Sequence, residues 1–120
     1  MEVDSNSILT SVKKAIGGIY ECDEDFDSDI IMFINSEFAE LCQLGVGPEE
    51  GFEIEDKTSK WTDFISDKRL NFVQQYITIK VKMVFDPPQS SFVMDTLNKK
   101  TEELKWRLNV AAEQLKDAGE

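Results

Sequence analysis

The sequence predicts an all-α fold, built as a single domain over residues 1–120, with four to five helices and a long C-terminal helix. Three observations support this prediction. Apolar residues recur at intervals of three and four in most segments, as they do along one face of a helix. A double proline separates two of these segments. The hydrophobic content of 41% is enough for one compact core in a chain of 120 residues.

Two helices are predicted in the first half of the chain. Apolar residues between Ser7 and Ile16 follow helical spacing, and two glycines then stop the helix. The second helix has Asp27 or Ser28 as its N-cap and Gly45 as its C-cap. Its apolar residues lie on more than one face, which predicts a position at the centre of the bundle or between subunits.

Residues 45–60, GVGPEEGFEIEDKTSK, predict a long loop because they are rich in glycine and in charged residues. Phe52-Glu53-Ile54 alternates like a strand, so we expect a short hairpin or an extended loop near residues 50–56. A loop of this length usually serves function or contacts another chain. We therefore expect it to reach another protein chain rather than to bind a small ligand.

The segment Leu70–Phe85 fits both a helix and a strand, because its last nine residues alternate as well as repeating at helical intervals. We favour a helix that packs against residues 30–44. The apolar run is longer than an average strand, and no equally good partner strand exists elsewhere. A helical turn at Trp61–Ile65, with Thr58 or Ser59 as its cap, precedes this segment.

Pro87 and Pro88 end the Leu70–Phe85 helix, because proline lacks a backbone N–H and disfavours helical geometry in the residue before it. Ser90 or Ser91 can then cap the last helix, which runs from Phe92 to about Lys116. This helix has a heptad-like apolar pattern, typical of a helix that lies along others. The pattern consists of Leu97, Thr101, Leu104, Leu108, Ala111 and Leu115.

The net charge of −11 lies entirely in the first half of the chain. Residues 1–60 contain fifteen Asp or Glu and four Lys or Arg, whereas residues 61–120 contain nine of each. The acidic half would repel the phosphates of a nucleic acid. A DNA-binding surface on this half is therefore not expected.

The sequence predicts no catalytic, cofactor-binding or metal-binding residues and no enzyme activity. The chain has no histidine, the usual general base, and two cysteines, too few for a disulfide framework or a zinc site. The alternating acids that begin at Asp23 do not form an EF-hand, because Ser28 and Ile34 occupy the glycine and glutamate positions. The glycines of residues 45–51 lack a Walker lysine.

Neither a membrane segment nor a secretory leader is expected. No run approaches the roughly 18 apolar residues that a spanning helix needs, and MEVDSNS is acidic and polar. We expect the protein to be made and used in a cytosol.

Several blocks of sequence, in a fixed order, carry a family resemblance. They are DSDIIMFINSEFAELCQLGVGP at residues 27–48, the Trp61-bearing segment, FDPPQSSF at residues 85–92 and ELKWRLN at residues 103–109. Over about residues 7–110 the chain resembles the head-tail connector (adaptor) proteins of long-tailed bacteriophages and prophages.

This resemblance implies a structural protein without chemistry. It implies a closed ring of about a dozen copies at the neck of the virion, assembled in the host cytoplasm. Each ring would dock on the portal and present its other side to the next head-closure or tail protein. DNA would only pass through the channel, and no cofactor is implied.

Candidate contacts with a neighbouring subunit or the portal combine lysines with aromatic and apolar residues: Phe52, Ile54, Trp61, Lys80, Lys82, Lys99, Lys100, Lys105 and Trp106. For the two tryptophans, a core or subunit contact is favoured over ligand binding. The lysines fit solvated helix faces, contacts with the acidic half of a neighbour, or nucleic acid. The alternative function is accordingly a DNA-packaging or nucleic-acid-binding module that uses the Lys80–Lys105 patch.

Overall fold

The computed structural model describes residues 6–118, and the surroundings of side chains up to residue 114. It confirms an all-α fold, and residues 6–118 contain no strand. Two short helices, α2 and α4, accompany the four longer ones. The elements are α1 (Ile8–Ile16), α2 (Gly18–Cys22), the 3₁₀ turn η1 (Glu24–Phe26), α3 (Asp27–Gln43), α4 (Trp61–Phe64), α5 (Leu70–Phe85) and α6 (Ser91–Ala118).

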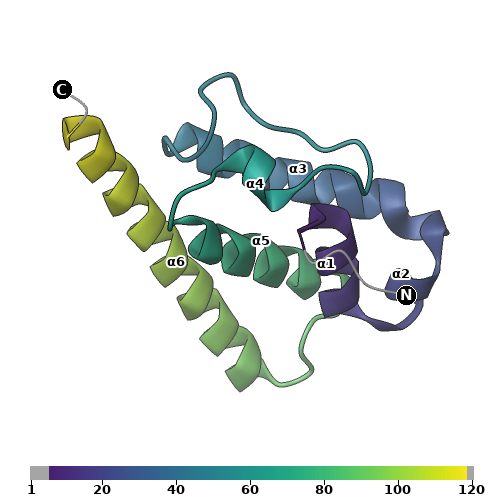
Figure 1. Ribbon diagram of the computed structural model, residues 1–120. Helices are drawn as coiled ribbons and strands as arrows, with labels where there is room; N and C mark the ends of the chain where they lie inside the picture. Colours follow the sequence, from purple (N-terminus) through teal and green to yellow (C-terminus); the bar gives the residue numbers. More distant parts are fainter. Residues whose placement is uncertain (1–5, 119–120) are drawn as a thin grey trace.

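Helix α5 is the central element of the fold, because it packs against α1, α3, α4 and α6 (Figure 1). Its residues Val73, Tyr76, Ile77 and Val81 are buried. The prediction that Leu70–Phe85 is a helix and packs against the preceding long helix is therefore confirmed. Four other helices contact α5, which explains why its sequence is apolar enough to resemble a strand as well.

Helix α3 ends one residue before the predicted C-cap: Leu44 is the C-cap, and Gly45 is the residue that follows it. Gly45 has a positive φ of 86°, its N–H donates to the carbonyl of Cys42, and the N–H of Val46 donates to the carbonyl of Leu41. This pair of bonds is a Schellman motif. The predicted N-cap was wrong, because η1 leads directly into α3 and makes Phe26 the N-cap.

The proline corner also forms where it was predicted. Helix α5 ends at Phe85, and Ser90 accepts a hydrogen bond from the N–H of Val93 in the first turn of α6. In α6, Thr101, Leu104 and Leu108 are buried as the heptad pattern predicts. The next buried residue is Ala112 rather than the predicted Ala111, because a straight helix drifts from a seven-residue repeat. Leu97 is half-buried, and the side chain of Leu115 lies outside the described residues.

Residues 45–60 form an extended loop rather than a hairpin, and the loop is fastened to its own subunit. The amide group of Asn35 on α3 accepts from the N–H of Ile54 at 2.7 Å and donates to its carbonyl at 3.0 Å. Ser7 donates to the carbonyl of Lys57 at 2.6 Å. The predicted cap of α4 was wrong: Lys60 is the N-cap, and its N–H donates to Asp63.

Candidate interaction surfaces

The apolar residues predicted as interface contacts near the loop lie mainly in the core. Trp61 is 1% exposed, and its indole N–H donates to the hydroxyl of Ser11 at 2.9 Å. Ile54 is buried, and Phe52 is half-buried against Phe38 and Phe64. The structure therefore places Trp61 among core residues, the first of the two roles that the sequence favoured. A contact of these three residues with another chain stays a prediction.

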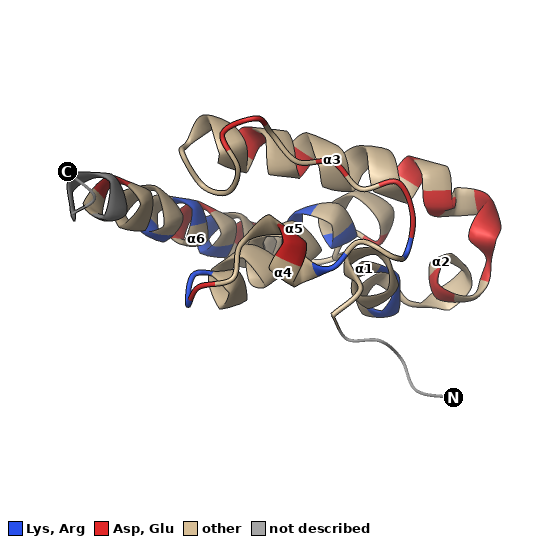
Figure 2. Cartoon of the chain, turned by 45° about the horizontal axis from the view of Figure 1, so that its top comes forward, with Lys and Arg blue, Asp and Glu red and all other residues tan. Residues whose placement is uncertain are grey.

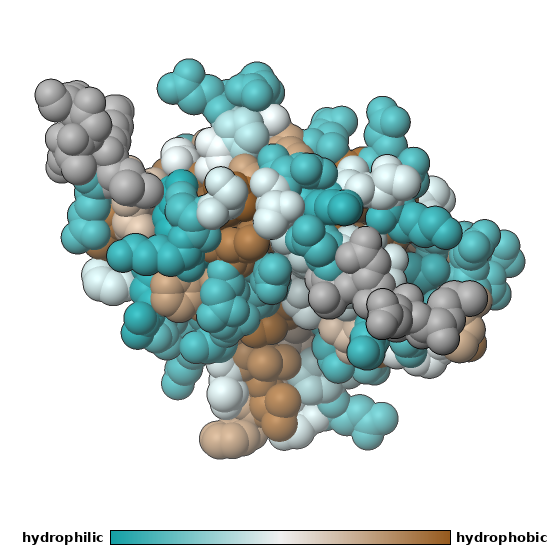
Figure 3. Space-filling view, in the orientation of Figure 1, coloured by the Kyte–Doolittle hydropathy of each residue, from teal (hydrophilic) through white to brown (hydrophobic). Residues whose placement is uncertain are grey.

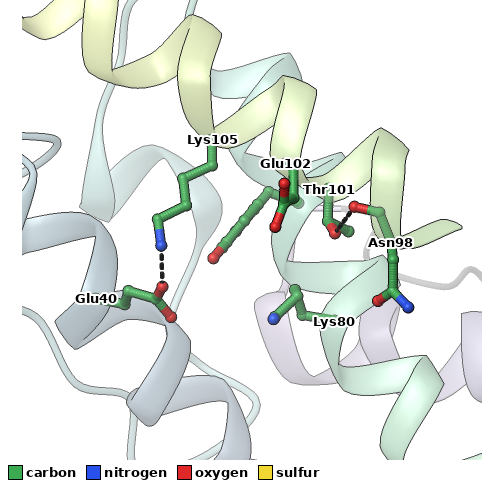
Figure 4. Close-up of a pocket in the computed structure, with 7 residues that line it drawn as sticks. Glu40, Lys80, Asn98, Thr101, Glu102 and Lys105 are labelled. Atoms are coloured by element: carbon green, nitrogen blue, oxygen red, sulfur yellow. Dashed lines mark hydrogen bonds and ion pairs between the residues drawn. The ribbon is translucent and has the colours of Figure 1, made fainter. Parts of the chain in front are cut away.

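Two of the predicted lysines line a polar cleft between α3, α5 and α6. Lys105 on α6 forms an ion pair with Glu40 on α3, and Lys80 on α5 points toward the same space (Figure 4). Tyr76, Asn98, Thr101 and Glu102 complete the lining of the cleft. The Lys105–Glu40 pair connects α6 to α3 across α5.

Glu37 lies next to this cleft, and its environment opposes ionisation. Its carboxyl group is partly buried beside the side chains of Glu40 and Tyr76. Burial raises the pKa of Glu37 above its ordinary value of 4.5, although the charge of Lys80 acts in the opposite direction. The hydrogen bond from Lys105 lowers the pKa of Glu40. Burial, followed by the charges of Glu37 and Glu40, raises the pKa of Tyr76.

These opposite shifts predict opposite effects of two matched substitutions on stability. Glu37→Gln should stabilise the protein at pH 7, because it removes a carboxylate that the fold disfavours. The gain in stability should shrink as the pH falls from the raised pKa of Glu37 towards 4.5.

Glu40→Gln should destabilise the protein at pH 7. This loss of stability should disappear as the pH falls from 4.5 through the lowered pKa of Glu40. Urea unfolding in steps of about half a pH unit, from about pH 3.5 to pH 7, measures the stability of both variants. Equal pH profiles for the two variants would contradict this assignment.

The remaining lysines differ in their surroundings. Lys82 donates to the carbonyl of Ala15 at 2.9 Å and so caps the C-terminal end of α1. Lys99 and Lys100 are exposed on α6 and have no ion-pair partner within the described part of the chain. Of the five predicted lysines, Lys99 and Lys100 are therefore the two best placed to meet a partner.

One face of α6 points away from the rest of the protein and exposes two large aromatic residues. Phe92 is 77% exposed and Trp106 is 64% exposed, and both follow a seven-residue spacing through Lys99. Figure 3 shows apolar surface at the lower end of the molecule, where α6 begins. We define the outer face of α6 as the exposed residues Phe92, Thr96, Lys99, Lys100, Glu103 and Trp106.

Phe92 was not among the residues selected from the sequence. The repeat of Phe92, Lys99 and Trp106, on the side of α6 opposite to Leu104 and Leu108, could have indicated it. Lys99, Lys100 and Trp106 of the same face were selected, so Phe92 is the large aromatic residue of this face that was missed.

A group of acidic residues lies at the opposite side of the molecule, where α2, η1 and the start of α3 follow one another, and further acidic residues lie along the 45–60 loop (Figure 2). We define the acidic arc as residues 19–32, which include six acidic residues and no basic one. Asp27 is paired with Lys13 at 2.8 Å. The arc also exposes two apolar side chains, Ile19 at 61% and Met32 at 60%. Neither was selected from the sequence: Ile19 lies between the two predicted helices, and Met32 lies in a helix whose apolar residues occupy more than one face.

The described residues offer no group of three or more His, Cys, Asp or Glu side chains that could hold a metal ion. Within residues 6–118, no helix combines the length and the apolar character that crossing a membrane requires.

The chain is thus an all-α protein with two distinct surfaces: the outer face of α6, with exposed aromatic residues and lysines, and the acidic arc. The phage connector protein family matches residues 8–115, and the chain belongs to this family. Its members are structural proteins, which assigns the chain a structural role at the phage neck. No curated protein and no solved structure matches the chain.

Proposed function

We propose that this protein is the subunit of a homo-oligomeric ring that joins the portal to the next head-closure or tail component. The observation that carries the proposal is the exposure of two large aromatic residues, Phe92 and Trp106, on one face of α6. Large aromatic residues on one helix face are typical of surfaces that become buried on association. Membership of the connector family supplies the context in which such association has a role.

The charge distribution supports a ring rather than a two-fold dimer. The acidic arc lies on one side of the molecule and α6 on the other, with α5 between them (Figures 1 and 2). A contact between two different surfaces repeats from one copy to the next and closes into a ring when the rotation allows it. The resemblance implies about a dozen copies in such a ring.

The alternative, a nucleic-acid-binding module, finds less support in the lysines. Lys82 and Lys105 are bound within the subunit, and Lys80 faces the cleft that holds Glu40. Lys99 and Lys100 alone would provide a small positive surface for phosphates.

Native mass spectrometry of the protein with and without its cognate portal tests the proposal. We expect a complex that contains many copies per portal ring at low salt. Screening at about 1 M salt should weaken it, because the Debye length falls to roughly 3 Å. A chain that stays monomeric and adds no mass to the portal would contradict the proposal. Binding of duplex DNA at low salt, without portal assembly, would favour the alternative.

A further inference from the structure

We propose that the outer face of α6 of one copy docks on the acidic arc of the next copy, as the repeating contact of the ring. This inference rests on the proposed function and adds the residues that make the contact. The occupant of the outer face of α6 is thus a second copy of this chain.

Charge complementarity is the first argument for this pairing. Lys99 and Lys100 are exposed cations without an ion pair among the described residues. The acidic arc has the strongest excess of negative charge among the described segments, and Glu24 and Asp25 are exposed there. Opposite charges on two surfaces steer association and fix which surfaces meet.

The arrangement of apolar residues is the second argument. On α6, Phe92 and Trp106 lie on either side of the two lysines, about 21 Å apart for fourteen residues of helix. In the acidic arc, exposed Ile19 and Met32 lie on either side of the acids in the sequence. Both surfaces therefore combine a charged centre with exposed apolar residues, so a contact between them would bury apolar surface as well as pair charges.

The positions of the two surfaces are the third argument. Helix α6 and the α2–η1 segment lie at opposite sides of the subunit in Figures 1 and 2. Each copy can therefore use both surfaces at once. Repetition of this contact gives a chain of subunits or a closed ring, whereas a self-complementary surface would stop at a dimer.

Cross-linking through the native thiol of Cys22, which is exposed within the acidic arc, provides the test. The variant Lys99→Cys is made in a Cys42→Ser background, so that each copy carries one thiol on each surface. The matched control is Lys68→Cys in the same background, because Lys68 is an exposed lysine outside both surfaces. Each protein is mixed with portal and treated with a short bis-maleimide.

We expect a ladder of cross-linked oligomers from Lys99→Cys and at least tenfold less from Lys68→Cys. Absence of the ladder, while native mass spectrometry still shows many copies on the portal, would overturn the docking mode and leave the proposed function standing. Cross-linked dimers without larger species would overturn it as well. A wild-type protein that shows no multi-copy assembly would overturn both proposals.

A charge exchange covers the case in which Lys99→Cys disturbs the fold. Lys99→Glu/Lys100→Glu and Glu24→Lys/Asp25→Lys should each weaken assembly at least tenfold. The chain that carries all four substitutions should recover it, because the complementary charges then meet again. No recovery in a combined variant with wild-type circular dichroism would overturn the docking mode.

Discussion

Replacing Ile77 with alanine is expected to lower the free energy of unfolding by about 2–5 kcal/mol. Ile77 is fully buried on α5, the helix that packs against α1, α3, α4 and α6. Removal of its side chain would leave a cavity among helices that cannot all move inward together. Urea unfolding followed by circular dichroism measures the loss.

Ile19→Ala is the matched control for this substitution. Ile19 is 61% exposed, so the same chemical change should alter the stability of the isolated protein by no more than about 0.5 kcal/mol. Ile19 belongs to the acidic arc, so its substitution should weaken assembly instead. Similar losses of stability for both variants would show that Ile77 is not part of a tightly packed core.

Gly47→Ala is expected to be the most damaging small substitution in the 45–60 loop. Gly47 has a φ of 91°, and a Cβ atom at this position would overlap Cε1 and Cζ of Phe64. The ring of Phe64 is 3% exposed and packs against Phe38 and Phe52, so it has little room to move. The left-handed backbone costs about 1–2 kcal/mol for alanine. Crowding of the core adds about 1–3 kcal/mol.

Gly51→Ala separates these two contributions. Gly51 has a similar φ of 94°, but nothing lies within 4 Å of the position of an added Cβ. Its substitution should therefore show the backbone cost alone. Thermal unfolding of the two variants gives the difference, and equal losses would contradict the proposed clash with Phe64.

Local signals in the sequence determined most of the helical framework. The glycine after Leu44, the double proline and Ser90 each act through the backbone conformation or hydrogen bond of one or two residues. Such effects do not depend on the rest of the fold, and α3, α5 and α6 end or begin within about two residues of the predicted places. The family resemblance also rested on these blocks, and the match over residues 8–115 confirmed it.

Tertiary structure decided which of the candidate tryptophans and lysines remain at the surface. The sequence shows Trp61 and Trp106 as equivalent candidates, yet Trp61 is buried and Trp106 is exposed. Residues distant in sequence produce this difference, because Ser11 binds the indole of Trp61 and Phe38 packs beside it. The same applies to the lysines. Lys105 on α6 forms an ion pair with Glu40 on α3 because both helices pack against α5. Periodicity indicates that a helix has an apolar face, but burial depends on which neighbour covers that face, and contacts between distant segments determine that neighbour.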